Sequence, residues 1–161
     1  NWEYDVMDAG FKCNMTDISA AIGLIELERY DNDTQIKRKH IFDTYQAAFS
    51  KDSRFQVPVY VTDSKTGCYH LYPLRIKGIT EQQRDAIMKE IFDCDVSVNV
   101  HFIPVPSMTY YKNLGYDMKN YPVTYDNFSR EISLPVFYNL TDEQTQTVIN
   151  AVISSVDRVL K

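Results

Sequence analysis

The sequence predicts an α/β domain of the α+β-like kind, in which helices cover a small mixed β-sheet of three to four strands. Three observations support this fold class. Apolar residues recur at helical spacing in several segments, they alternate with polar residues in a few short ones, and capping patterns mark where helices begin. The chain has 161 residues, and 44% of them are hydrophobic, which is enough for one core. Residues 1–161 are therefore expected to form a single domain.

The first predicted helix follows a polar turn at residues 12–16. Thr16 and Asp17 favour a helix start, because a hydroxyl or carboxylate accepts hydrogen bonds from the free N–H groups of a first turn. Apolar residues surround most of this helix: Ile18, Ala20, Ala21, Ile22, Leu24, Ile25 and Leu27. We expect other elements to cover it on more than one side. Gly23 permits close approach of another backbone, either within one domain or at a subunit interface.

The next segments predict a second helix and an edge strand. Residues 31–33 form a break, and a helix is expected from Thr34 to about Phe49. Hydrophobic residues then alternate over residues 55–61. Pro58 restricts this segment to an edge strand or a loop, because proline lacks the N–H that a sheet ladder uses.

Residues 69–76 predict a further strand, and Pro73 within it indicates an edge position or a bulge. Thr80 and Gln83 then form a capping-box pattern. In such a box each residue satisfies an N–H group of the other, so the pattern predicts a helix from this point to about Phe92.

Residues 96–102 alternate most regularly and predict the clearest strand. One face of this strand carries Val96, Val98, Val100 and Phe102, and the other carries Ser97, Asn99 and His101. A short helix is expected at residues 108–114, and another at residues 122–130, where Pro122 suits the first helical position.

The C-terminal residues predict a short strand and a long helix. Residues 132–136 are extended and are stopped by Pro135. Thr141 and Gln144 repeat the capping-box pattern and begin the final helix. Valines line one face of this helix at helical spacing: Val148, Val152, Val156 and Val159.

Composition and motifs exclude several function classes. The net charge of −5 argues against a nucleic-acid partner, and no apolar run approaches the length of a membrane span. The histidines lack metal-ligand spacing, and the glycines form no phosphate-binding loop. Three widely spaced cysteines indicate a reducing cytoplasm rather than a disulfide framework. Because the chain begins at Asn1 rather than at methionine, we expect it to be a piece of a longer protein.

An aromatic segment follows the polar face that carries His101. Its rings are Phe102, Tyr110, Tyr111, Tyr116 and Tyr121. Such rings stack on sugars and bases, and tyrosine hydroxyls form hydrogen bonds with them, so one interpretation is the wall of a ligand pocket. An ordinary edge of the core explains the same residues equally well.

Several motifs stand in a recognisable order: GFKCNMTDISAAIGL at residues 10–24, Lys37-Arg38-Lys39 with Tyr45, His70-Leu71-Tyr72, Val100-His101-Phe102-Ile103-Pro104, Tyr110-Tyr111 and Ile132-Ser133-Leu134-Pro135. This series resembles the DegT/DnrJ/StrS family of pyridoxal-phosphate-dependent sugar aminotransferases. The stretch at residues 10–24 is similar to the segment that follows the family's catalytic domain. The resemblance covers nearly the whole chain.

The resemblance implies that the chain is the C-terminal small domain of a type I pyridoxal-phosphate-dependent transferase. The cofactor is then bound mainly by an N-terminal domain, whose catalytic lysine lies before Asn1. Residues 1–10 form the connection from that domain. On this interpretation the chain contains no catalytic residue and does not transaminate alone.

The resemblance also implies a reaction and partners. In the family, glutamate donates an amino group to a nucleotide-linked keto sugar, and a homodimer completes each active site. A role in surface-polysaccharide or deoxysugar synthesis follows, although neither the sugar nor the aminated carbon can be read from these residues. The rival hypothesis is a free-standing domain that binds a sugar nucleotide or regulates a partner without catalysis, because no catalytic lysine or acid pair is present.

Four site residues follow from the matched motifs. Asn14 matches the asparagine that reaches the cofactor phosphate of the partner subunit, although a turn asparagine also bonds its own backbone. His101, Tyr110 and Tyr111 match the segment that approaches the sugar nucleotide. Pro106 stands where many members of the family carry a second histidine, which makes the usual substrate contact uncertain at this position.

Overall fold

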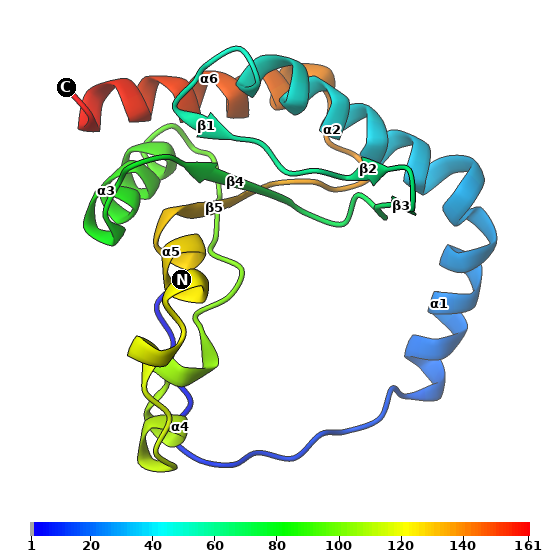
Figure 1. Ribbon diagram of the computed structural model, residues 1–161. Helices are drawn as coiled ribbons and strands as arrows, with labels where there is room; N and C mark the ends of the chain where they lie inside the picture. Colours follow the sequence, from blue (N-terminus) through cyan, green and yellow to red (C-terminus); the bar gives the residue numbers. More distant parts are fainter. Residues whose placement is uncertain (1) are drawn as a thin grey trace.

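The computed structural model describes residues 2–161 and confirms the α/β class, with helices around two small sheets (Figure 1). The strands are β1 (Phe55–Gln56), β2 (Val61–Thr62), β3 (Lys65–Thr66), β4 (Tyr72–Ile76) and β5 (Glu131–Leu134). One sheet has the strand order β1-β4-β5, and the other is the β2-β3 hairpin. Every strand pairing described between residues 2 and 161 is antiparallel, whereas the sequence predicted a mixed sheet.

Strand β4 lies at the centre of the three-stranded sheet and pairs with β5 without an inserted residue, so Pro73 lies neither at the edge nor in the bulge that the sequence predicted. The strand pairs with β5 from Tyr72 to Arg75, whereas β1 reaches only Arg75 and Ile76. At Pro73 the strand therefore has a neighbour on one side only. This arrangement accommodates the missing N–H group, because no ladder is interrupted on the other side.

Strand β4 directs alternate side chains to two different environments. Tyr72, Leu74 and Ile76 are completely buried in the core, which α2 (Gln35–Phe49) and α6 (Asp142–Val159) cover. Arg75 points to the other face of the sheet, where α5 (Pro122–Arg130) lies (Figure 1). The sheet thus separates an apolar core from a more polar face.

Aromatic rings fill the core between α2 and the sheet. Phe42 packs edge-on against Tyr60, Tyr69 and Tyr72, with ring centroids 4.3, 5.2 and 5.2 Å away. The hydroxyl groups of Tyr45, Tyr60 and Tyr72 donate hydrogen bonds to oxygen atoms of neighbouring segments, over 3.0, 2.6 and 2.9 Å. Burial raises the pKa of all three hydroxyl groups. The cluster is therefore apolar in its middle and hydrogen-bonded at its rim.

Two helices begin at capping boxes, as predicted. At the start of α3 (Glu81–Phe92), the Thr80 hydroxyl accepts from the Gln83 N–H group (3.2 Å), and the Gln83 side chain accepts from the Thr80 N–H group (2.9 Å). Thr141 and Gln144 form the same pair of bonds before α6. These bonds satisfy N–H groups that a helix start otherwise leaves free.

The first two helices form one continuous run rather than two helices with a break. A π-helical turn, η1 (Tyr30–Thr34), joins α1 (Asp17–Arg29) directly to α2. Asp33 forms ion pairs with Arg29 (3.0 Å) and with Lys37 (3.0 Å), each four residues away. Because residues at this spacing lie on one helix face, the polar residues that indicated a break instead support the joint.

Helix α1 extends away from the sheet, and none of its residues is buried (Figure 1). The predicted N-cap is confirmed, since the Thr16 hydroxyl accepts from the Ser19 N–H group (3.3 Å). The large apolar side chains of α1 are between 60% and 76% exposed: Ile18, Ile22, Leu24, Ile25 and Leu27. The cover that the sequence predicted for this helix is not supplied by residues 2–161.

Residues 96–102 do not form the predicted strand. The three valines of its inner face are buried, as the alternation requires. However, only Asn99 pairs with β5, through two hydrogen bonds with Ser133 (3.3 and 2.7 Å). The N–H group of His101 is bound by the Glu131 side chain instead. Phe102, the fourth residue assigned to that face, is 61% exposed. Alternation therefore predicted the burial of the valines, but neither the position of Phe102 nor the backbone bonding.

Short elements connect this segment to β5. They are the 3₁₀ turns η2 (Val105–Ser107) and η3 (Met118–Asn120), helix α4 (Thr109–Asn113) and helix α5. Gly115, with a φ of +92°, follows α4 and ends it as predicted. Within residues 2–161, no helix combines the length and the hydropathy that crossing a bilayer requires.

Candidate ligand site

A cavity of about 530 Å³ lies on the α5 face of the sheet. Residues from five parts of the chain line it, because β4, β5, α5, the segment before η2 and the segment after β1 meet there. The residues that matter for its chemistry are Arg75, His101, Phe102, Asn127, Phe128 and Glu131. The cavity therefore includes His101, which the sequence predicted as a substrate residue.

Glu131 is the first residue of β5, and only 6% of it is exposed. One carboxylate oxygen accepts from the His101 N–H group (2.9 Å) and the other from the Ser133 hydroxyl (2.5 Å). Burial raises the pKa of this carboxyl group, although both hydrogen bonds and the nearby Arg84 and Arg75 act in the opposite direction. A buried carboxylate with both oxygens bound has a fixed position.

The His101 ring lies at the mouth of the cavity. Its centroid is 3.6 Å from that of Phe102 and 6.4 Å from that of His70. Partial burial and, secondarily, His70 lower the pKa of His101. The imidazole is therefore neutral near pH 7 and offers one N–H donor and one acceptor nitrogen.

The remaining polar groups of the cavity belong to β4 and α5. The Arg75 guanidinium donates a hydrogen bond to the Asn127 side chain, whose amide in turn donates to the Val123 carbonyl (2.9 Å). The rings of Phe102 and Phe128 lie beside these groups, and Phe102 is 61% exposed. A cation, an amide, an imidazole and two rings around one cavity suit a ligand that has hydroxyl groups and a flat apolar face.

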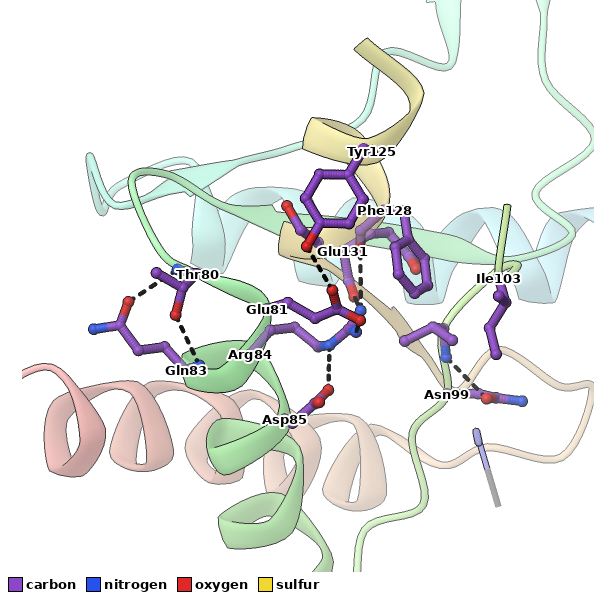
Figure 2. A network of polar contacts seen from close by, with 12 residues as sticks. Thr80, Glu81, Gln83, Arg84, Asp85, Asn99, Ile103, Tyr125, Phe128 and Glu131 are labelled. Carbon is purple, nitrogen blue, oxygen red and sulfur yellow. Dashed lines mark hydrogen bonds and ion pairs between the residues drawn. The ribbon is translucent and has the colours of Figure 1, made fainter. Parts of the chain in front are cut away.

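A network around Arg84 supports the wall of this cavity (Figure 2). The Arg84 side chain is 1% exposed, and it donates to the carbonyl groups of Phe128 (2.8 Å) and Glu131 (3.3 Å). It also binds the carboxylates of Asp85 (2.7 Å) and Glu81 (3.5 Å). The guanidinium thereby joins α3 to α5 and β5, and it fixes the backbone from which Glu131 extends.

The two predicted tyrosines lie on α4, and they are not among the residues that line this cavity. The rings of Tyr110 and Tyr111 meet edge to face with centroids 5.3 Å apart, and the Tyr111 ring meets that of Tyr116 at 6.0 Å. Among residues 2–161 no hydrogen bond or ring contact joins either tyrosine to His101. The structure thus gathers the tyrosines into their own aromatic group.

Three consecutive N-terminal residues hold the segment that carries these tyrosines. The Tyr4 hydroxyl accepts from the Ile103 N–H group (3.0 Å). The Asp5 carboxylate accepts from the N–H group (2.8 Å) and the hydroxyl (2.5 Å) of Thr109, and these bonds lower the pKa of Asp5. The Val6 carbonyl accepts a further bond (2.7 Å) from the first turn of α4. The start of α4 is thus capped from the other end of the sequence.

Asn14 lies in the exposed turn before α1, and its side chain bonds to no other residue between 2 and 161. A free amide at an exposed turn fits a hydrogen bond to a phosphate group that another part of the protein brings to it. Asn14 lines none of the cavities described between residues 2 and 161. Its turn therefore offers one amide whose chemistry fits a single contact to a phosphate group.

Sequence reasoning missed the polar residues that shape the cavity around His101. Arg75, Asn127 and Glu131 come from three separate elements, and only the folded chain brings them together. One signal was present for Glu131, because a charged residue directly precedes the apolar strand residues of β5. Pro106 lies in η2 and is half-buried, outside the cavity lining.

Comparison of the sequence with known proteins identifies a related family and related proteins. The model of the DegT/DnrJ/EryC1/StrS aminotransferase family matches residues 1–153. The spore coat polysaccharide biosynthesis protein SpsC of Bacillus subtilis (strain 168) is 34% identical over 157 residues, which are 94% of this chain and 39% of that protein. A UDP-4-amino-4,6-dideoxy-N-acetyl-β-L-altrosamine transaminase of Campylobacter jejuni (serotype O:2) is 25% identical over 161 residues, 99% of this chain and 42% of that protein.

Solved structures agree with this assignment. The apo form of Spr1654 from Streptococcus pneumoniae, a proposed sugar aminotransferase, matches with a TM-score of 0.86 and 39% identity, over 99% of this chain and 39% of that one. Its PMP and PLP forms match with the same TM-score. PseC of Helicobacter pylori has a TM-score of 0.78 at 23% identity, which bears on the fold alone.

The chain spans about two fifths of the length of these relatives. The sequence match nevertheless covers almost all of the chain itself, and the fold agrees with the solved relatives over the same residues. The motifs that carried the resemblance, from Gly10 to Pro135, fall inside the matched range. The chain belongs to the DegT/DnrJ/EryC1/StrS aminotransferase family.

Proposed function

We propose that this chain is the C-terminal domain of a longer, dimeric, cytoplasmic aminotransferase that moves an amino group from glutamate to a nucleotide-linked keto sugar. On its own the chain is inactive, because the lysine that bonds to the cofactor belongs to another domain. One observation carries the proposal of a larger assembly. Helix α1 exposes five large apolar side chains, which is unusual for a helix that has no further partner.

The relatives support the sugar as the acceptor. The transaminase from Campylobacter jejuni is named for a UDP-linked amino sugar, and SpsC is named for polysaccharide biosynthesis. The cavity on the α5 face supports the same class of ligand, since it combines polar donors and acceptors with aromatic rings.

The cofactor of the proposed reaction is pyridoxal phosphate, which when bound supplies an electron sink for amino transfer. This chain contributes to cofactor binding through Asn14, whose side-chain amide donates a hydrogen bond to the phosphate group of the cofactor held in the partner subunit. His101 orients the sugar through its neutral ring. Tyr110 and Tyr111 line the approach of the sugar nucleotide and exclude water from it.

Replacing Asn14 with alanine in the longer protein should weaken retention of the cofactor about ten-fold to a hundred-fold, because a hydrogen bond to a charged group contributes about 1.5–3 kcal/mol. The measurement is the dissociation constant of pyridoxal phosphate from its absorbance during dialysis. Asn32 is the matched control, since it is exposed on η1 in the same helical run. If Asn14→Ala retains the cofactor as well as Asn32→Ala, Asn14 is not a cofactor ligand.

The proposed function is tested by the absorbance spectrum of the longer protein before and after adding glutamate. We expect a coloured, cofactor-bound protein whose absorbance spectrum changes when glutamate is added. The spectrum should also change when UDP-4-amino-4,6-dideoxy-N-acetyl-β-L-altrosamine is added, because this amino sugar can act as an alternative amino donor. A colourless protein that does not respond to added pyridoxal phosphate would establish the rival hypothesis of a binding or regulatory domain. A response to glutamate without one to the amino sugar would retain the aminotransferase and reject this sugar.

A further inference from the structure

The backbone at His101 is held by a side chain rather than by a sheet. Asn99 forms the last backbone pairing of its segment with β5, and two residues later the His101 N–H group donates to the Glu131 carboxylate (2.9 Å). The next N–H group with a hydrogen bond is that of Ile103, which donates to the Tyr4 hydroxyl. Between the last sheet bond and Ile103, Glu131 is therefore the contact from a distant element that sets the path of the chain at His101.

Glu131 is itself held rigidly. Its backbone pairs with Arg75 of β4, and its carbonyl accepts from the buried Arg84 guanidinium (3.3 Å). Its second carboxylate oxygen accepts from the Ser133 hydroxyl (2.5 Å). Every part of Glu131 thus has a partner within the sheet or the Arg84 network, so the oxygen that binds His101 has little freedom to move.

We propose that Glu131 is a positioning residue, which fixes the backbone of His101 so that the imidazole faces the ligand cavity. This inference rests on the proposed function, because His101 is there assigned to the sugar nucleotide. Glu131 does not touch the reacting atoms in this assignment. It acts through His101, and it should therefore affect the sugar half of the reaction and leave the glutamate half unchanged.

The charged groups around Glu131 and His101 support a role for Glu131 beyond packing. Arg75 and Arg84 both lie near enough to the carboxyl group to act against the rise in its pKa, and His70 lies beside the His101 ring. A buried carboxyl group is costly, and an apolar residue would pack a sheet edge at lower cost. The hydrogen bond that Glu131 accepts from the His101 N–H group, at the cavity lining, is a contact that an apolar side chain could not make.

Three variants separate positioning from simple structural support. Glu131→Ala removes the acceptor of the His101 N–H group. Glu131→Gln keeps an oxygen for that N–H group, and its amide can donate to the Ser133 hydroxyl, so it should restore the wild-type behaviour. Ser133→Ala is the matched control, because it removes the other bond of the same carboxylate and leaves the bond to His101 in place.

The first measurement uses the 161-residue chain and does not depend on any reaction. Labelled imidazole groups of His40, His70 and His101 are followed by NMR, together with exchange of the His101 amide. In Glu131→Ala the His101 amide should exchange roughly ten-fold faster, and the His101 ring signals should shift while those of His40 do not. Glu131→Gln and Ser133→Ala should resemble the wild type. An unchanged His101 in Glu131→Ala would overturn the positioning role.

The second measurement uses the cofactor-loaded longer protein and follows the two halves of the reaction separately. With glutamate, all variants should react within about two-fold of the wild type. With the UDP-linked amino sugar, Glu131→Ala should react at least ten-fold more slowly, and Glu131→Gln should recover. Equal losses in both halves, or a loss in neither, would overturn the proposal. If the wild type itself responds to glutamate and not to the amino sugar, this sugar is rejected as the substrate. The NMR signals and the amide exchange of His101 then still decide whether Glu131 is a positioning residue.

Discussion

Replacing Arg84 with alanine should lower the free energy of unfolding by about 3–5 kcal/mol, because it breaks a buried set of charged hydrogen bonds. The guanidinium is 1% exposed and bonds to two carbonyl groups and two carboxylates (Figure 2). In the variant the carbonyl oxygens of Phe128 and Glu131 lose a buried donor. The midpoint of urea-induced unfolding, followed by circular dichroism, measures the change.

Arg158 provides the control for this experiment. It forms an ion pair with Glu90 (2.7 Å) and, like Arg84, it links α3 to another element. Half of its side chain is exposed, so water replaces the lost contact and the midpoint in Arg158→Ala should hardly change. If the unfolding midpoint of Arg84→Ala changes as little as that of Arg158→Ala, the Arg84 network does not stabilise the fold.

Replacing Phe42 with alanine should cost about 3–5 kcal/mol, since it removes a ring from a fully packed core and leaves a cavity. Phe42 is 2% exposed and makes three edge-to-face contacts with tyrosine rings. For a chain of this size the loss corresponds to a fall in melting temperature of roughly 10 °C or more. Thermal unfolding of the 161-residue chain measures it.

Two further variants show whether the loss comes from the core. Phe42→Leu keeps most of the volume and should cost about 1.5 kcal/mol or less. Phe11→Ala makes the same chemical change at a side chain that is 100% exposed, and it should leave the melting temperature unchanged. A Phe42→Ala variant as stable as Phe11→Ala would contradict the packed aromatic core.

The elements that the sequence predicted well are those whose bonds are local. The capping boxes at Thr80 and Thr141 join residues three positions apart, so the whole interaction is visible in the sequence. The buried valines of α6 follow from helical spacing in the same way. Here the residues that predict the structure are also the residues that form it.

The predictions failed where a distant partner decides the structure. The strand expected at residues 96–102 is lost because Glu131, thirty residues away, takes the N–H group that a ladder would use. Pro73 lies in a central strand because β1 ends before reaching it. The cover expected around α1 is a further case, since no part of residues 2–161 buries any residue of this helix. No local pattern contains this information.

The candidate site divides in the same manner. Asn14, His101, Tyr110 and Tyr111 followed from the family's motifs, and their roles stay predictions. Arg75, Asn127 and Glu131 join His101 only through the pairing of β4 with β5 and the packing of α5. Resemblance could therefore propose residues for ligand contact, but it could not identify the residues that the fold brings to His101.

The bonds from Tyr4, Asp5 and Val6 fasten the N-terminal residues to the chain around α4. The same covalent stretch continues, within a few residues, through Asn14 into α1. In Figure 1 this stretch crosses from the α4 end of the molecule to the start of α1. Residues 7–16 span at most about 36 Å even when fully extended, so their length limits how far the start of α1 can move from the N-terminal anchor.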